Sequence, residues 1–386
     1  MKNSLRALTI LCCFFLLTPV IATAEDIYWY DPKELTSPTV QDGMTPSPTA
    51  TPIPDVESFK EEDGSTLLTF SFTGDVTIGG DVRKNSMSIF DKELAKQEGD
   101  ITFPFRNVKS IFEADDMTLV NFEGTLTTFP INPEKKNNSF LFSAPPSYVE
   151  VLTSGGVDAV ALENNHVYDH GLQGYQQTQE TLGNADIVYS GNGEIGVFEA
   201  KGIEIAMLSY QTFDQYPVLF EQVPVDIAAA KAQYPIVIVS FHWGAEMDYR
   251  PNDNQQKMGK LAIDSGADLV VGHHSHRINP IEEYNGKYIC YSLGNFSFAG
   301  NTKPNDMSTY IFQTRFRISP EGDVNPDGFI IIPCRISSKS EYNDFMPTPY
   351  EKQSSIDSLL SVLASNGEYL VNPVPVYPLS WDYWIQ

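Results

Sequence analysis

The chain has 386 residues, and its 50 aspartates and glutamates outnumber its 25 lysines and arginines, so its formal net charge is −25. The composition is 41% hydrophobic and 12% aromatic, which excludes a disordered protein. The length has room for one large domain or two ordinary ones. The acid excess argues against a general nucleic-acid binder and against docking on anionic lipid, because both need a basic face.

Residues 1–24 have the pattern of a secretory signal peptide. Lys2 and Arg6 precede an apolar run that ends in a small-residue cleavage site, Ala22-Thr23-Ala24. The alternative, an uncleaved membrane anchor, is disfavoured because the run is shorter than the ~20 residues that span a bilayer. We therefore expect a protein that is secreted or extracellular, or held in the cell envelope.

Residues 25–65 are predicted to be a linker and residues 341–386 a proline-rich C-terminal tail, which leaves one domain over residues 66–340. The stretch from Ser37 to Pro54 is rich in proline and threonine and lacks apolar periodicity, as extended linkers do. Two cysteines, Cys290 and Cys334, remain after the signal peptide. We favour buried free thiols at these two positions over a disulfide, because a single bridge could not stabilise a fold of this size.

From residue 66 onward the chain alternates short apolar runs with helix-like stretches, as a layered α/β domain does. Strands are predicted at Leu67–Thr73, Met117–Phe122, Asp158–Leu162, Ile203–Ser209, Pro235–Phe241 and Ala267–Val271. Helices are predicted at Gln173–Leu182, Ile227–Gln233 and Asn254–Ser265. Further on, the turn Asn285-Gly286 joins Ile281–Tyr284 to Lys287–Leu293 in a hairpin, and Tyr310–Ile318 pairs with Gly328–Ile336.

The metal-capable side chains follow the predicted strands. The six histidines are His166, His170, His242, His273, His274 and His276, and each group of them comes just after a strand. Four other polar residues take similar positions: Asp75, Asn121, Glu123 and Asn165. Because the carboxyl ends of parallel strands face one edge of a sheet, these side chains are expected to converge. Carboxylate, amide and imidazole groups suit one or two divalent ions for a hydrolytic reaction.

The run Gly-His-His-Ser-His at residues 272–276 is the most specific of these signals. Three imidazoles within four residues make little sense without a metal or an anion, because of their mutual repulsion and desolvation. His170 is interpreted differently, as a helix-capping pair with Asp169. The basic pairs Arg83-Lys84 and Lys135-Lys136 are interpreted as solvated loop charges.

The motifs GDV, NFEG, ENNHVYDHG, SFHWGAE, GHHSH and SLGNF occur in this order between about Thr66 and Gly300. In this series the chain resembles the poly-γ-glutamate capsule-synthesis (CapA) family, which is related to the calcineurin-like metallophosphoesterases. The resemblance implies a metallophosphoesterase-like, four-layer α/β/β/α sandwich. It also implies that loops at the strand ends hold a dinuclear centre of divalent ions such as Mn, Zn or Fe.

The resemblance also implies roles for single residues. Asn165 would coordinate metal and His166 would face the leaving group as the catalytic acid. The other ligands would be Asp75, Asn121, Glu123, His242 and two histidines of the GHHSH loop. Among those, His274 and His276 are favoured, with His273 as the competitor. Ser292 and Asn295 of the SLGNF motif would support the site.

Two positions depart from the phosphoesterase pattern. Thr77 stands where the first motif has a histidine, and the bridging aspartate of the second motif is replaced by Asn121 or Glu123. A site with one imidazole fewer would bind its first ion more weakly or use a single ion.

Two classes of function compete. The first is a secreted metal-dependent hydrolase or transferase that acts on a phosphoester or on a γ-glutamyl amide, with His166 as acid. The second is a non-catalytic component that binds or anchors an anionic cell-surface polymer such as poly-γ-glutamate and works with a capsule polymer ligase or export proteins. A module that binds cell-wall polysaccharide is a third and weaker alternative. Because the acidic chain repels a polyanion, binding would need a basic patch or a bound cation.

Overall fold

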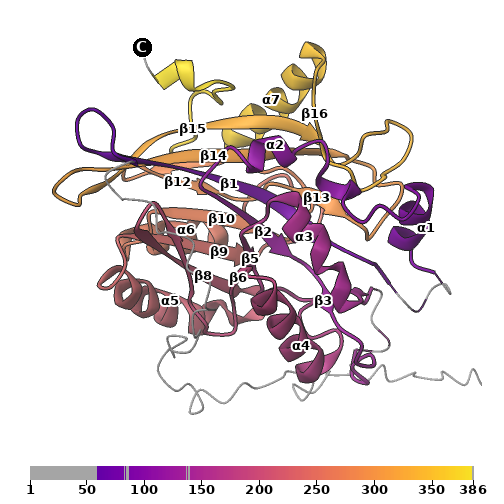
Figure 1. The fold of residues 1–386 in the computed structure, drawn as a ribbon. Helices are drawn as coiled ribbons and strands as arrows, with labels where there is room; N and C mark the ends of the chain where they lie inside the picture. The colour runs from indigo at the N-terminus through magenta and orange to yellow at the C-terminus, as the bar shows by residue number, and fades with distance from the viewer. Residues whose placement is uncertain (1–58, 82, 84–86, 136, 138–139, 385–386) are drawn as a thin grey trace, which may run out of the picture. The chain divides into compact units, whose positions relative to one another are not determined.

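The computed structural model describes residues 59–384 except 82, 84–86, 136 and 138–139. The predicted signal peptide and most of the predicted linker lie outside the described residues. Two β-sheets face each other, with helices on their outer faces (Figure 1). No helix among the described residues is both long enough and apolar enough to cross a membrane.

The first sheet has the strand order β16-β15-β14-β1-β2-β5-β6, and β13 also pairs with β1. Strands β1, β2, β5 and β6 run parallel, and β14 and β15 form an antiparallel pair. The bounds are β1 Thr66–Thr77, β2 Met117–Phe122, β5 Ala159–Ala161, β6 Val188–Ser190, β13 Asn295–Phe298, β14 Ser308–Ile318, β15 Val324–Arg335 and β16 Thr348–Pro349.

The second sheet has the order β11-β12-β10-β9-β8-β7, with parallel strands in its centre and the antiparallel β7 and β11 at its edges. Its bounds are β7 Gly196–Ala200, β8 Ile203–Gln211, β9 Ile236–His242, β10 Leu269–His273, β11 Ile281–Tyr284 and β12 Lys287–Cys290. A small separate pair joins β3 Thr125–Leu126 to β4 Ser143–Ala144.

Helices connect the strands and cover both sheets. Their bounds are α1 Ile89–Lys96, α2 Lys109–Phe112, α3 Glu150–Gly155, α4 Gly171–Asn184, α5 Tyr216–Lys231, α6 Asp253–Asp264 and α7 Gln353–Gly367. Short 3₁₀ turns lie at Phe103–Phe105, Pro146–Val149, Phe213–Gln215 and Trp381–Trp384.

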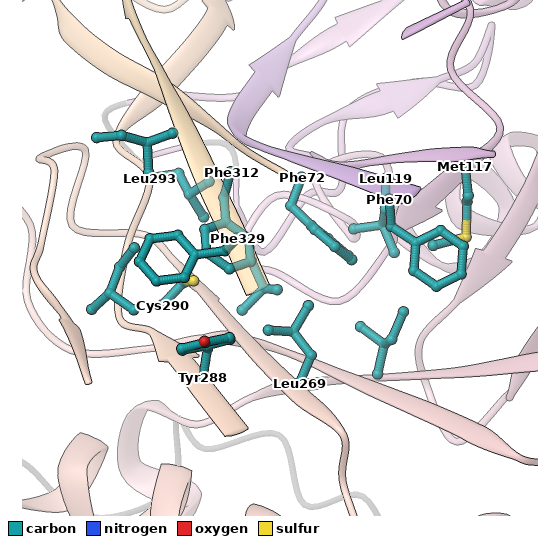
Figure 2. Close-up of a cluster of buried hydrophobic side chains, with 14 of the residues drawn as sticks. Phe70, Phe72, Met117, Leu119, Leu269, Tyr288, Cys290, Leu293, Phe312 and Phe329 are labelled. Atoms are coloured by element: carbon teal, nitrogen blue, oxygen red, sulfur yellow. The ribbon is translucent and has the colours of Figure 1, made fainter. Parts of the chain in front are cut away.

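Three apolar clusters hold the layers together. Alternate residues of β1, including Phe70 and Phe72, pack against Leu269 of β10 and Cys290 of β12 between the two sheets (Figure 2). The opposite face of the first sheet packs on α3 and α4, and the opposite face of the second sheet packs on α5 and α6. Alternation along a strand therefore buries both faces of each sheet, which confirms the predicted α/β class.

The predicted strands are confirmed with small shifts of their ends, whereas one predicted helix is much longer than expected. The strands predicted at residues 67–73, 117–122, 158–162, 203–209, 235–241 and 267–271 correspond to β1, β2, β5, β8, β9 and β10, and both antiparallel pairs are present. Helix α5 begins eleven residues before the predicted 227 and carries Pro224 inside it. Cys290 and Cys334 are buried free thiols, as favoured from the sequence.

A β-bulge in β1 turns its last residues toward the space between the sheets. Phe72 pairs with Leu119, but the next matched pair is Asp75 with Asn121, so β1 contains one residue more than β2 in this interval. The extra residue moves Asp75 onto the face that carries Phe72, while Val76 packs with the outer cluster. The bulge therefore aims a carboxylate at the second sheet.

The segment predicted as a tail after residue 340 packs on the domain. Strand β16 pairs with β15, and α7 buries Leu359 and Leu363 in the cluster between the sheets. Val374 and Tyr377 join the same cluster. The packed domain thus extends beyond the predicted boundary, because spaced apolar residues outweigh the high proline content of this segment.

The packing of α7 predicts the cost of truncating its buried side chain. Leu363→Ala should lower the free energy of unfolding by about 2–5 kcal/mol, since it removes a fully buried leucine and leaves a cavity. Val371→Ala is the matched control, because Val371 is 74% exposed, and it should change stability by less than about 0.5 kcal/mol. Urea unfolding measures both, and equal stabilities would contradict the extended domain.

Candidate metal centre

The carboxyl ends of strands from both sheets meet at one cluster of polar side chains. Asn121 at the end of β2 donates from Nδ2 to Asp75 Oδ1 at 2.8 Å, and the same nitrogen lies 3.4 Å from His242 Nδ1. His242 ends β9 in the second sheet, and its Nε2 lies 2.9 Å from Asn165 Oδ1. The amide of Asn121 therefore links ligands of the two sheets.

The GHHSH loop after β10 completes the cluster. His276 Nδ1 lies 3.0 Å from Asp75 Oδ2, and His273 Nδ1 lies 3.7 Å from Asp75 Oδ1. The His274 ring has its centroid 4.5 Å from that of His242. The predicted candidates from β1, β2, β5, β9 and β10 are thus brought together.

The backbone of this loop is strained. His274 has φ 90° and His276 has φ 53°, in the left-handed region that side chains with a Cβ rarely adopt. Such residues cost on the order of 1–3 kcal/mol each and persist where the surroundings enforce them. Here the strain lets histidines two positions apart both face Asp75 and its neighbours.

Burial and mutual charge shift the protonation of the cluster. Burial lowers the pKa of His242 well below its usual value, and it lowers the pKa values of His273 and His274 to about 4. Burial works in the same direction on His276, but the carboxylates of Glu123 and Asp75 outweigh it and raise its pKa to about 9. At neutral pH three of the four imidazoles are therefore neutral and carry a lone pair that a metal can bind.

The two buried carboxylates behave differently. Burial favours the neutral form of Asp75, but the hydrogen bond and charge of His276 hold its pKa below the usual value. Burial and the neighbouring charge of Asp75 raise the pKa of Glu123 well above its usual value. Of the two carboxylates, Glu123 is therefore the one that burial drives toward its neutral form.

Unpartnered atoms show that the cluster suits a cation. Among the described residues, buried side-chain atoms without a hydrogen bond include both oxygens of Glu123, both ring nitrogens of His273 and Nδ1 of His274. Buried polar atoms are normally satisfied. Two groups have ligand atoms within 4.8 Å of one another, namely Asp75 with Glu123 and His276, and Glu246 with His274 and His276. Imidazole and carboxylate together fit a divalent transition metal.

His166 stands at the edge of the cluster and is held by Asp169. Its Nδ1 lies 2.7 Å from Asp169 Oδ2, and its Nε2 lies 3.7 Å from Glu123 Oε1. The capping interpretation of Asp169 and His170 is wrong: α4 begins at Gly171 without a side-chain cap, and His170 Nδ1 contacts Phe129 O at 2.6 Å instead. Asp169 orients the histidine three positions before it.

Lys135 is also part of this neighbourhood. Its Nζ lies 3.1 Å from Asp169 Oδ1 and donates to the backbone oxygen of Asn165 at 2.5 Å. The interpretation of Lys135 as a solvated loop charge is therefore wrong, because its side chain reaches back to the strand-end loop. Arg83 pairs with Asp81, and Lys84 and Lys136 lie outside the described residues.

The two residues predicted to support the site, Asn295 and Ser292, lie at different distances from the metal cluster. Asn295 Oδ1 lies 2.8 Å from His276 Nδ1, so Asn295 contacts a ligand directly. Ser292 accepts a hydrogen bond from the Gly294 backbone at 3.2 Å and shapes the turn. Thr77, which stands where the phosphoesterases have a histidine, donates to the backbone oxygen of Glu123 at 2.8 Å.

Sequence reasoning missed three residues. Glu246 belongs to one of the two ligand groups. It lies in the same SFHWGAE motif as His242 but was not among the predicted ligands. Asn164 donates to Asn121 Oδ1 at 3.3 Å and to Phe122 O at 2.8 Å, so it fixes the loop that carries Asn165. The His-x-x-Asp spacing at 166–169 was the available signal for Asp169.

The fold and this cluster define an α/β protein whose paired sheets hold a candidate metal centre at their strand ends. Residues 69–299 match the family "Bacterial capsule synthesis protein PGA_cap". The chain is 31% identical over 294 residues to the PGA biosynthesis protein CapA of Bacillus subtilis, covering 69% of this chain and 73% of that one. The chain belongs to this bacterial capsule synthesis family.

Other relatives are more distant. The capsule biosynthesis protein CapA of Bacillus anthracis is 29% identical over 273 residues, or 64% of each chain. Among solved structures, the NAD nucleotidase of Haemophilus influenzae matches this chain with a TM-score of 0.39 and 12% identity, over 83% of this chain and 66% of that one. Similarity at this level says nothing about the activity of this chain.

The ligand set predicts stabilisation by added metal. Mn²⁺ or Zn²⁺ at about 100 times its Kd should stabilise the metal-free protein by ~2.7 kcal/mol and raise Tm by about 5 °C. His274→Ala should reduce this rise in Tm, since it removes one of the three possible ligands in the group of Glu246, His274 and His276.

His170→Ala is the matched control for this measurement. His170 is also a buried histidine but contacts Phe129, so its variant should keep the full rise in Tm even if its starting Tm is lower. Thermal unfolding with and without each ion gives the answer. An ion-independent Tm in the unsubstituted protein would rule out the metal centre.

Proposed function

We propose that this protein is exported and acts as a metal-dependent hydrolase on an anionic cell-surface polymer, poly-γ-glutamate or a related chain. The observation that carries the proposal is the set of unpartnered ligand atoms directly beside the His166–Asp169 pair. Such a pair next to a metal centre is suited to hydrolysis, because the metal and the general acid then act on the same bond.

The proposed ligands come from both sheets. They are Asp75, Asn121, Glu123, Asn165, His242, His274 and His276, with His273 and Glu246 as further candidates. A divalent ion held there would supply Lewis acidity toward a substrate oxygen and toward water.

The chain's own residues would handle the proton. Asp169 accepts from Nδ1 of His166 and thereby leaves Nε2 as the atom that gives a proton to the leaving group. Lys135 holds the other carboxylate oxygen of Asp169, so the pair keeps its orientation. His166 is then a catalytic residue, and Asp169 and Lys135 are positioning residues.

Aromatic rings border the site and would limit the access of water. The Phe142 ring packs with its centroid 4.4 Å from that of His166, and Phe298 packs 5.0 Å from His276. On the other side Phe213 lies edge-on to His274 at 4.7 Å. Exclusion of water strengthens the electrostatic interactions of a bound substrate.

The role in polymer synthesis is supported by family membership and by the names of the relatives, which are PGA and capsule biosynthesis proteins. Export is supported by the sequence pattern of residues 1–24. A polymer ligase and export proteins are the partners we propose for this role.

A non-catalytic, polymer-binding function is the second candidate. It is favoured by Thr77, whose hydroxyl is engaged with the backbone of Glu123 and adds no ligand where the phosphoesterases have an imidazole. A weaker metal site would still bind an anionic chain through its cation.

Incubation of the protein with poly-γ-glutamate and Mn²⁺, followed by sizing of the polymer, separates the two candidates. Shortening of the polymer is expected for the hydrolase, and co-elution without shortening would favour the binder. His166→Ala should slow cleavage by about 10²–10⁴-fold, the usual contribution of a general acid. His170→Ala should cleave at the normal rate, and normal cleavage by His166→Ala would remove His166 from the mechanism.

A further inference from the structure

The strand ends of the second sheet carry a row of polar side chains that continues past the proposed ligands. His273 of β10 pairs with His242 of β9, and His242 pairs in turn with Gln211, the last residue of β8. Paired residues of neighbouring strands project to the same face of a sheet, and the strands lie about 4.8 Å apart. Gln211 therefore stands beside His242, on the strand next to β9 and away from β10.

The face that Gln211 occupies is the one turned toward the first sheet. Ile205 and Met207, which precede it at intervals of two along β8, belong to the apolar cluster between the sheets. Ser209 comes next in this alternation, and its hydroxyl oxygen lies 2.6 Å from that of Ser190 at the end of β6. The contact between the two serines ties β8 to the first sheet just before Gln211.

The backbone after Gln211 is fastened to the strand that carries the metal-capable histidine. The Thr212 amide donates to the backbone oxygen of His242 at 3.1 Å. The side chain of His242 in turn has its Nε2 2.9 Å from Asn165 Oδ1. Gln211 and the proposed ligand Asn165 are thus both neighbours of His242. Both are half-buried, so part of each side chain stays accessible to a substrate.

The side-chain amide of Gln211 has no hydrogen bond to any residue that the structure describes. Polar groups that lose contact with water normally have a partner. Each of the other half-buried glutamines in the described part of the chain has one, namely Gln97 with Glu93, Gln177 with Thr127, Gln179 with Glu194, Gln222 with Asp226 and Gln256 with Pro251. Gln211 is therefore the half-buried glutamine whose donors and acceptor are left to a ligand.

We propose that Gln211 is a substrate-binding residue of the metal centre and that it hydrogen-bonds an amide group of the chain cleaved there. The inference rests on the proposed function for the presence of a bound chain, and it adds that the site recognises an amide-linked backbone. A glutamine side chain offers two N–H donors and one acceptor oxygen, so it can donate to the C=O or accept from the N–H of an amide.

A neutral contact of this kind suits the charge of the protein. With 50 acidic and 25 basic residues, the protein has few cations to pair with every carboxylate of a polyanion. Recognition through the uncharged backbone lets those carboxylates stay in water, where they keep their solvation. A glycerol phosphate polymer has no amide and offers no N–H to the Gln211 oxygen, so it is the competing ligand to be tested.

Gln211→Met tests the contact, because it removes the donors and the acceptor at nearly the same side-chain length. A γ-linked glutamate hexamer is titrated calorimetrically into the full-length His166→Ala protein with Mn²⁺ present, since that variant is expected to cleave the hexamer slowly. Adding Gln211→Met should weaken binding about five- to tenfold, the usual contribution of a hydrogen bond. The rise in Tm caused by Mn²⁺ should stay the same, because Gln211 contacts the chain and not the ion.

Gln233→Met is the matched control. Gln233 is an exposed glutamine that precedes β9 at the opposite end of the same sheet, so the same exchange there should leave hexamer binding unchanged. Unchanged binding in Gln211→Met would overturn the proposal. A smaller rise in Tm would do so too, because it would make Gln211 a metal ligand. Tighter binding of glycerol phosphate oligomers than of the hexamer would overturn the recognition of amides.

The proposed function can fail separately from this contact. A protein that cleaves no polymer, yet binds the hexamer more weakly in Gln211→Met, keeps the amide contact and loses the hydrolase. A protein that cleaves the polymer with the same KM in Gln211→Met as in the unsubstituted chain keeps the hydrolase and loses the contact.

Discussion

The candidate metal centre depends on one close approach of two backbones, at Gly74 of β1 and Gly294 before β13. A Cβ atom on Gly74 would lie 1.9 Å from the Gly294 oxygen, so no other residue fits there. The Asp75 amide donates to that same oxygen at 2.9 Å, and this contact sets Asp75 opposite Asn295 in the sheet. Both side chains then reach His276. Without this approach, the carboxylate of the first sheet and the histidine loop of the second would not share a partner.

Charge is the second constraint, and it explains why the cluster is poised for a cation. At neutral pH the ion pair of Asp75 with His276 satisfies one carboxylate, while burial and the charge of Asp75 drive Glu123 toward its neutral form. His242, His273 and His274 remain neutral for the same reason of burial. A divalent ion would let Glu123 ionise and would displace the proton of His276, so metal binding and proton release are coupled at this site.

The sequence predicted those parts of the fold and site that depend on local pattern. Strands β1, β2, β5, β8, β9 and β10 are short apolar runs, and the polar residues that end them converge because parallel strands share a direction. Their convergence across two sheets follows from packing between the sheets, which no local pattern contains. The family resemblance supplied that step.

The sequence did not predict what depends on contacts between distant segments. Asp169 looked like a helix cap because it stands just before α4, and its hydrogen bond with the Phe142 backbone comes from a segment 27 residues away. Lys135 looked solvated because its partner is 34 residues away. The segment after residue 340 looked like a tail because its proline content is a local feature, whereas its burial depends on packing against residues of both sheets that are far away in the sequence.

The acid excess of the chain takes on a specific meaning in this setting. A protein with 50 acidic residues and 25 basic ones repels a polyanion at a distance, so any grip on such a chain must be local. Some cations of the described region, such as Lys231 with Asp268 and Arg317 with Asp327, are neutralised by ion pairs within the protein. Arg250, Arg277, Arg315 and Arg335 have no carboxylate within ion-pair distance among the described residues and contact ring faces, amide, hydroxyl or backbone oxygens instead. A polyanion is therefore expected to bind where a local cation, such as a bound metal ion, outweighs this long-range repulsion.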